Sequence, residues 1–172
     1  VIQGISGLLD AHLSGERTDQ LQMVRTIIYD KVTALTAAQG ITAALLARER
    51  GAGGQHVKLS MLDAALYFNW PDLMWNFSFK GQGVQYSPDL ADMCEVNETK
   101  DGAIISSYLG ADCSGYETEQ LLQLLAENDI PVGRVNRRSQ VITDPQVRAS
   151  GTLLDIQHPR GGELVQPRAA AQ

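Results

Sequence analysis

Asp30 is the residue whose type and position most directly suggest chemistry. It stands where a helix N-cap belongs, at the start of a helical pattern that runs from Asp30 to Arg50. The free N–H groups and the dipole of a helix N-terminus stabilise a carboxylate. An ionised carboxylate at the edge of a cleft can attack an activated carbonyl group as a nucleophile. A plain capping aspartate has the same local pattern, so both interpretations stay open.

The other potentially reactive side chains lack the spacing of a known kind of site. Three histidines are scattered along the chain: His12, His56 and His158. Since none has metal-ligand spacing, we expect no metal site. Cys94 and Cys113 pair with no histidine at a suggestive spacing and are predicted to be small, partly buried thiols. The glycines of residues 51–54 follow a helix, whereas a phosphate-binding loop precedes one, so they predict a helix end. Residues 80–83 predict a turn, with a lid over a cleft as the alternative.

The elements that must position Asp30 alternate between helix and strand. The β-branched run over 26–28 predicts a strand that leads into the helix, and α/β folds place ligand sites at such junctions. Gly40, inside that helix, predicts the close approach of another backbone. Residues 1–9 predict the tail of a buried strand or a turn. The remaining predicted elements are a strand over 56–60, a helix over 61–79 interrupted at Pro71, a strand over 103–108, a helix over 117–127, a strand over 131–135, a short helix over 141–148, and strands over 153–156 and 163–166 joined around Gly161 and Gly162. This alternation predicts an α/β fold.

Composition excludes several classes of protein. The chain has 172 residues, of which 44% are apolar and 20% charged, as in an ordinary soluble globular protein. No apolar run reaches the roughly 18 residues that a membrane helix needs, so we expect no membrane partner. A net charge of −6 without a basic cluster argues against a nucleic-acid partner. Two cysteines make no disulfide framework, so we expect a cytoplasmic protein.

Several blocks together resemble the family III CoA-transferases, which include formyl-CoA transferase, carnitine CoA-transferase and alpha-methylacyl-CoA racemase. The most specific block is ITAALLARERGAGGQHVKLSMLDAAL at residues 41–66, and the next is IPVGRVNRRSQVITDPQVRASGTLLDIQHP at residues 130–159. Residues 1–9, 27–40 and 98–104 extend the resemblance in the family's order. The resemblance therefore covers roughly half of the chain.

The resemblance implies a catalytic role for Asp30, because the family's catalytic aspartate sits just before this long helix. In the transferases that carboxylate forms a mixed anhydride with the acyl group and then an aspartyl-CoA thioester. Met61 falls where the transferases place a methionine that lines the CoA thiol end of the pocket, although a methionine there also suits a core position. CoA and acyl-CoA would be substrates, and no permanently bound cofactor is expected.

The resemblance also implies an architecture. Residues 1–80 would belong to a Rossmann-like large CoA-binding domain, residues 81–160 to a smaller α/β domain, and residues 161–172 to the start of the return to the large domain. Family members are interlocked homodimers, so a dimer is expected. Family members are also much longer than this chain. The segment that corresponds to residues 106–117 is longer in them as well. The resemblance thus predicts that this chain, which starts at Val1 without a methionine, is incomplete.

Two alternative functions stay open. Alpha-methylacyl-CoA racemisation or epimerisation would use Asp30 as an acid/base opposite a histidine. Residues 2–7 and 93–97 resemble the transferase branch more than the racemase branch. The other alternative is an inactive fragment that needs a partner chain for CoA binding.

Overall fold

The computed structural model describes residues 1–12, 22–107 and 109–171, and the chain divides into two compact units, Val1–Asp92 and Met93–Gln172. Helices and antiparallel sheets are both present, which confirms the predicted α/β class. Within the described residues, no helix combines the length and the apolar character needed to span a bilayer. The assignment of residues 1–80, 81–160 and 161–172 to the domains of a longer enzyme stays a prediction.

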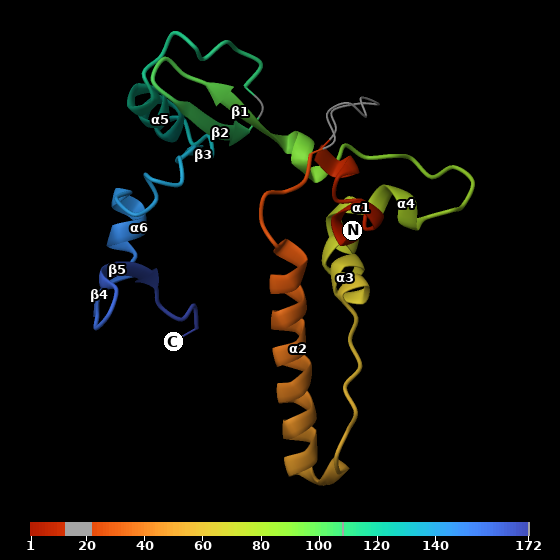
Figure 1. The fold of residues 1–172 in the computed structure, drawn as a ribbon. Coiled ribbons are helices and arrows are strands. Elements are labelled where there is room, and N and C mark those ends of the chain that lie inside the picture. Colours follow the sequence, from red (N-terminus) through yellow and green to blue (C-terminus); the bar gives the residue numbers. More distant parts are fainter. Residues whose placement is uncertain (13–21, 108, 172) are drawn as a thin grey trace. The chain divides into compact units, whose positions relative to one another are not determined.

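The first unit is built around one long helix (Figure 1). Its elements in chain order are α1 (Ile2–Ile5), η1 (Asp10–His12), α2 (Ile28–Ala47), η3 (Arg48–Ala52), α3 (Met61–Leu73), α4 (Trp75–Ser78) and η4 (Leu90–Met93), of which η4 ends one residue beyond the unit. The helix predicted from Asp30 to Arg50 is thus present as α2. Its apolar residues Leu35, Ile41 and Leu45 are exposed, and Tyr29 is the one buried residue of the helix.

After α2 the chain reverses and returns alongside the helix. The reversal uses Gly51 at φ 91°, a conformation that favours glycine. Residues 53–60 then run back in an extended conformation and lead into α3, which packs beside α2 (Figure 1). A Cβ at Gly40 would lie 3.2 Å from Cγ1 of Val57 on this return segment. The close approach predicted at Gly40 is therefore made by a side chain and not by another backbone.

Four local predictions for the first unit were wrong in whole or in part. Residues 1–9 form the short helix α1 and then turns over 6–9, so the strand tail is wrong and the alternative of a turn holds only for the second half. Residues 56–60 are extended, but no described strand pairs with them, so the predicted strand does not form. Residues 26–28 likewise form no strand, and α2 begins at Ile28. Pro71 lies inside α3, and the helix breaks only at Met74, where φ is −110° and ψ is 1°.

The second unit contains a small sheet covered by a helix. Strands β1 (Cys94–Glu98), β2 (Ala103–Ser107) and β3 (Val132–Arg134) form an antiparallel sheet in that order. Ile104 of β2 points into a core that also contains Cys113 and, from α5 (Thr118–Glu127), Leu121 and Leu125. The predicted helix and strands of this part are thus confirmed, with shifts of one residue at their ends. The predicted end of the first strand at residue 108 lies outside the described residues.

A hairpin follows the sheet in the chain. Helix α6 (Pro145–Ala149) is N-capped by Asp144, whose side chain accepts a hydrogen bond from the Val147 N–H. Strands β4 (Leu153–His158) and β5 (Gly162–Pro167) then pair antiparallel. Gly162, at φ 73°, lies at the turn, as the two glycines there predicted.

Candidate active site

Asp30 lies in the first turn of α2, but it is not the N-cap. Ile27 is the N-cap, and no side chain caps it. Asp30 is the third residue of the helix, and its carboxylate is exposed. The N–H groups of a first turn have no partner within the helix, so this end of α2 favours a negative charge at Asp30. The predicted N-cap was three residues off, and the electrostatic reason for singling out Asp30 remains.

A buried polar network holds the residue next to Asp30. The Tyr29 hydroxyl accepts hydrogen bonds from Oγ of Ser6 at 2.8 Å and from Nδ2 of Asn69 at 2.7 Å. It donates to Oδ1 of Asn69 at 3.1 Å, and Asn69 Nδ2 also donates to the backbone carbonyl of Ser6 at 3.0 Å. Ser6, Tyr29 and Asn69 are 3%, 2% and 2% exposed. The network therefore ties together the end of α1, the first turn of α2 and the middle of α3.

The segment that leads into α2 is also held by a residue of α1. The Gln3 side chain donates to the carbonyls of Val24 and Thr26 at 3.2 Å each and accepts from the Val24 N–H at 3.0 Å. Lys31 Nζ donates to Oγ1 of Thr26 at 2.7 Å, which closes the corner before the helix. Sequence reasoning missed Gln3, Ser6 and Asn69, because no local pattern connects residues 21 to 63 positions apart.

Met61 lies at the start of α3, well away from Asp30 within this chain. Ser60 caps the helix, since its Oγ accepts the Asp63 N–H at 3.0 Å, and Met61 is half-buried. Tyr29 contacts Asn69, and Met61 precedes Asn69 by eight residues of α3, or about 12 Å along the helix axis. One copy of the described chain therefore does not bring the two predicted site residues into contact, and both assignments stay predictions.

A cavity between α2 and α3 lies near Met61. Its lining comes from one side of each helix and from the return segment: Thr36, Gln39, Gly40, Ala43, Leu59, Asp63, Ala64 and Tyr67. Apart from Asp63, this lining offers little that could serve acid or base chemistry. In the part of the chain that the structure describes, no three histidine, cysteine, aspartate or glutamate side chains are placed to hold a metal ion.

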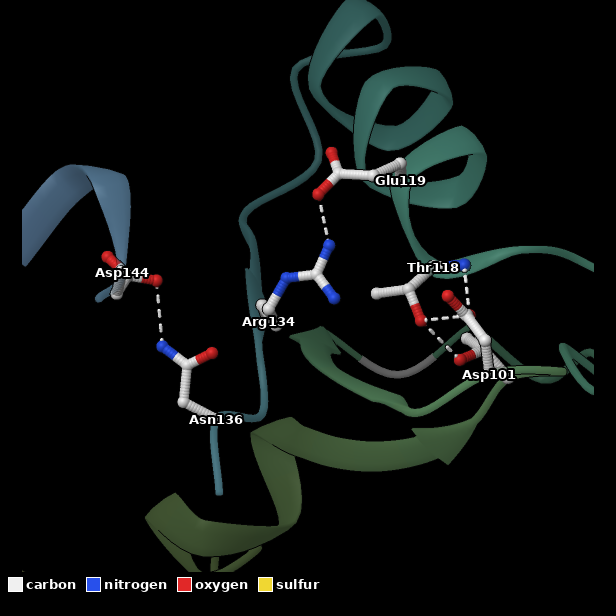
Figure 2. Close-up of polar contacts among 7 residues, drawn as sticks. Asp101, Thr118, Glu119, Arg134, Asn136 and Asp144 are labelled. Atoms are coloured by element: carbon white, nitrogen blue, oxygen red, sulfur yellow. Dashed lines mark hydrogen bonds and ion pairs between the residues drawn. The ribbon is translucent and has the colours of Figure 1, made fainter. Parts of the chain in front are cut away.

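A second polar cluster lies in the second unit and has a structural role (Figure 2). Oδ1 of Asp101 accepts the backbone N–H of Thr118 at 2.7 Å and its hydroxyl at 2.6 Å, so Asp101 caps α5 from the β1–β2 turn. Thr118 is fully buried and also meets Oγ1 of Thr99 at 2.6 Å. The Thr118 hydroxyl bond is the main cause that lowers the pKa of Asp101. Arg134 pairs with Glu119 beside this cap, so each group of the cluster has a partner.

The sequence of the whole chain was compared with models of protein families. A family model described as CoA-transferase family III matches residues 1–112 and 88–172. The chain belongs to CoA-transferase family III. The resemblance seen in the sequence is thereby confirmed. The family model matches the chain in two segments, which overlap over residues 88–112. The search of curated proteins gave no match.

Several solved protein structures share the fold of this chain. The chain matches Rv3272 from M. tuberculosis with a TM-score of 0.73 and 18% identity over 99% of this chain and 56% of that one. It matches a CAIB/BAIF family protein from Brucella suis with a TM-score of 0.69 and 20% identity over 98% and 58%. An aspartate-to-alanine variant of Rv3272 matches with a TM-score of 0.70 and 16% identity over 99% and 54%. The chain thus spans little more than half the length of the solved structures it matches.

Proposed function

We propose that the protein transfers CoA from an acyl-CoA to a carboxylic acid, with Asp30 as the nucleophile. The observation that carries this proposal is an exposed carboxylate in the first turn of α2, beside a buried and fully hydrogen-bonded tyrosine, in a family III chain. A carboxylate placed in this way is accessible to a substrate and needs no general base, because its oxygen carries the attacking electron pair.

The proposed reaction needs only the Asp30 carboxylate and the two substrates. One carboxylate oxygen attacks the thioester carbonyl, the C–S bond breaks, and CoA leaves as a thiolate from a mixed anhydride on Asp30. The thiolate then attacks the Asp30 carbonyl carbon, so an aspartyl-CoA thioester forms and the donor acid leaves as a carboxylate. The acceptor carboxylate reverses these two steps, and the Asp30 carboxylate is regenerated without net proton transfer.

The finer parts of the proposal concern CoA and the assembly. Met61 would contact the thiol end of CoA, which fits its half-buried position at the start of α3. A homodimer would cover the exposed apolar residues of α2, of which Leu35 is 74% exposed. The two cysteines, Cys94 and Cys113, are free, which fits a reducing cytoplasm.

Trapping the Asp30 intermediate tests the proposal. The complete protein is incubated with acetyl-, succinyl- or a 2-methylacyl-CoA, quenched with hydroxylamine and digested for peptide mass spectrometry. We expect a hydroxamate or CoA adduct on the peptide that contains Asp30, and none in Asp30→Asn. The matched control is Asp10→Asn, which removes a first-turn carboxylate from η1 and should leave the adduct in place.

Two outcomes would contradict the proposal. If the adduct is absent and deuterium is lost from the alpha carbon of the 2-methylacyl-CoA, the protein is a racemase or epimerase in which Asp30 moves protons. If neither reaction occurs, the protein has no such activity without a partner chain.

A further inference from the structure

The first turn of α2 is held chiefly by Tyr29, with the hydrogen bond from Lys31 to Thr26 beside it. Tyr29 is the one buried residue of this 20-residue helix, and its hydroxyl bonds Ser6 and Asn69. A buried polar network in which every member is satisfied fixes one arrangement, because any other leaves a buried donor or acceptor without a partner. The position of this helix end is therefore set by the Tyr29 hydroxyl.

Fixing Tyr29 also fixes the direction of Asp30. Neighbouring residues of an α-helix point about 100° apart around its axis. When the Tyr29 ring is held between α1 and α3, the Asp30 carboxylate must point outward at that angle. A rotation or shift of the first turn would move both side chains together. Beyond this first turn, α2 contributes half-buried side chains but no buried one.

The approach to the helix is tied to the same support. Gln3 of α1 binds the backbone at Val24 and Thr26, and Ser6 follows the end of α1 directly. Three hydrogen bonds of Gln3 and one from Ser6 to Tyr29 thus join the α1 region to the two sides of the corner that carries Asp30. Neither Gln3 nor Ser6 is exposed enough to act on a substrate, since they are 9% and 3% exposed.

We propose that Ser6, Tyr29 and Asn69 are positioning residues that hold the Asp30 carboxylate in its attacking direction. This inference rests on the proposed nucleophilic role of Asp30. The network does not touch the substrate. Its contribution is to reaction geometry, and a displacement of about 1 Å at a reacting group can lower a rate by about a hundredfold.

The test compares Tyr29→Phe with a matched control in single turnovers at saturating acyl-CoA. The Phe variant keeps the ring and removes only the hydroxyl. The control, Tyr86→Phe, removes the hydroxyl of a 73% exposed tyrosine of the first unit. We expect the rate constant of Asp30 labelling to fall roughly ten- to a hundredfold in Tyr29→Phe, with the final labelled fraction unchanged. The control should label like wild type.

The labelled fraction separates positioning from folding. A merely structural role would leave fewer folded molecules, so the labelled fraction would fall while the rate constant stayed the same. Either that result or an unchanged rate constant in Tyr29→Phe overturns the inference. Ser6→Ala should reproduce part of the loss, and combining it with Tyr29→Phe should add little, because both remove the same hydrogen bond.

Amide hydrogen exchange provides a readout that is independent of any CoA chemistry. The Lys31 N–H bonds the carbonyl of Ile27 and closes the first turn. We expect it to exchange at least several-fold faster in Tyr29→Phe, while amides near the middle of α2 keep their wild-type rates. Unchanged exchange at Lys31 would overturn the inference even if labelling slowed. If wild type is never labelled, the proposed function fails, and the exchange result alone reports whether the network holds the turn.

Discussion

Thr118 is the side chain of the second unit for which the stability lost on substitution can be estimated most directly. Its hydroxyl donates to Oδ1 of Asp101, so the hydrogen between Thr118 and Thr99 must come from Thr99. Thr118→Val keeps the β-branched shape and replaces the hydroxyl with a methyl group. The change removes both hydrogen bonds and leaves the Thr99 hydroxyl, which is 9% exposed, without its acceptor.

The expected cost is about 2 kcal/mol. A hydrogen bond contributes about 1 kcal/mol net, and a buried donor without a partner costs about 1–3 kcal/mol. The lower end applies because Asp101 keeps its bond from the Thr118 N–H and the Thr99 residue is near the surface. For a unit of about 80 residues, 2 kcal/mol corresponds to a fall in Tm of roughly 10 °C.

Thermal unfolding followed by far-UV circular dichroism measures this loss. The two tryptophans, Trp70 and Trp75, both lie in the first unit, so their fluorescence reports on that unit and should change little. Thr143→Val, at an exposed threonine of the second unit, is the control and should shift Tm by no more than about 2 °C. A similarly small shift in Thr118→Val would refute the assignment of Thr118 as the buried link. Thr99→Val removes the same Thr99–Thr118 hydrogen bond as Thr118→Val. The stability losses of the two single variants should therefore sum to more than the loss in the double variant.

Three further outcomes follow from the structure. The pKa of Asp101 is lowered from its ordinary value of 3.8, so its stabilising effect is fully present above about pH 4 and is lost as the pH falls below that value. The Tm of wild type should therefore approach that of Asp101→Asn as the pH falls below about 4, and a gap that stays constant would contradict the capping role. Leu121→Ala opens a cavity in the core of the second unit and should cost about 2–5 kcal/mol in urea unfolding; a loss below 1 kcal/mol would mean that this core is loosely packed. Gly51→Ala forces a Cβ onto a residue at φ 91° and should cost about 1–2 kcal/mol by the same method, whereas Gly54→Ala, where φ is not positive, should cost less.

Helices with strong local signals were predictable from the sequence, and so were turns that glycine dictates. The α5 pattern, with Leu121 and Leu125 on one side, and the Gly161–Gly162 turn depend on residues close together in the chain. The strand expected over 56–60 failed for a different reason. Alternating side chains predict an extended backbone, which the segment has, but a strand also needs a paired neighbour that local sequence does not specify.

The candidate site was only half predictable for the same physical reason. Asp30 could be singled out because helix-end electrostatics are local. The three residues that hold Tyr29 and its approach, Gln3, Ser6 and Asn69, act across 21 to 63 positions of sequence. Asn69 stands between Phe68 and Trp70, but Asn76 stands between Trp75 and Phe77 in the same way and is not buried, so the local sequence does not distinguish the buried asparagine.

The return segment has a consequence for handling the protein. Residues 53–60 are all exposed, and no hydrogen bond from a described residue occupies the backbone of residues 54–59. Such a stretch is a template for intermolecular pairing, and Val57 and Leu59 on it favour that pairing. Lys58 stands between them and places a positive charge in the stretch. Copies that stack edge to edge would bring these charges together, so the charge of Lys58 opposes such pairing.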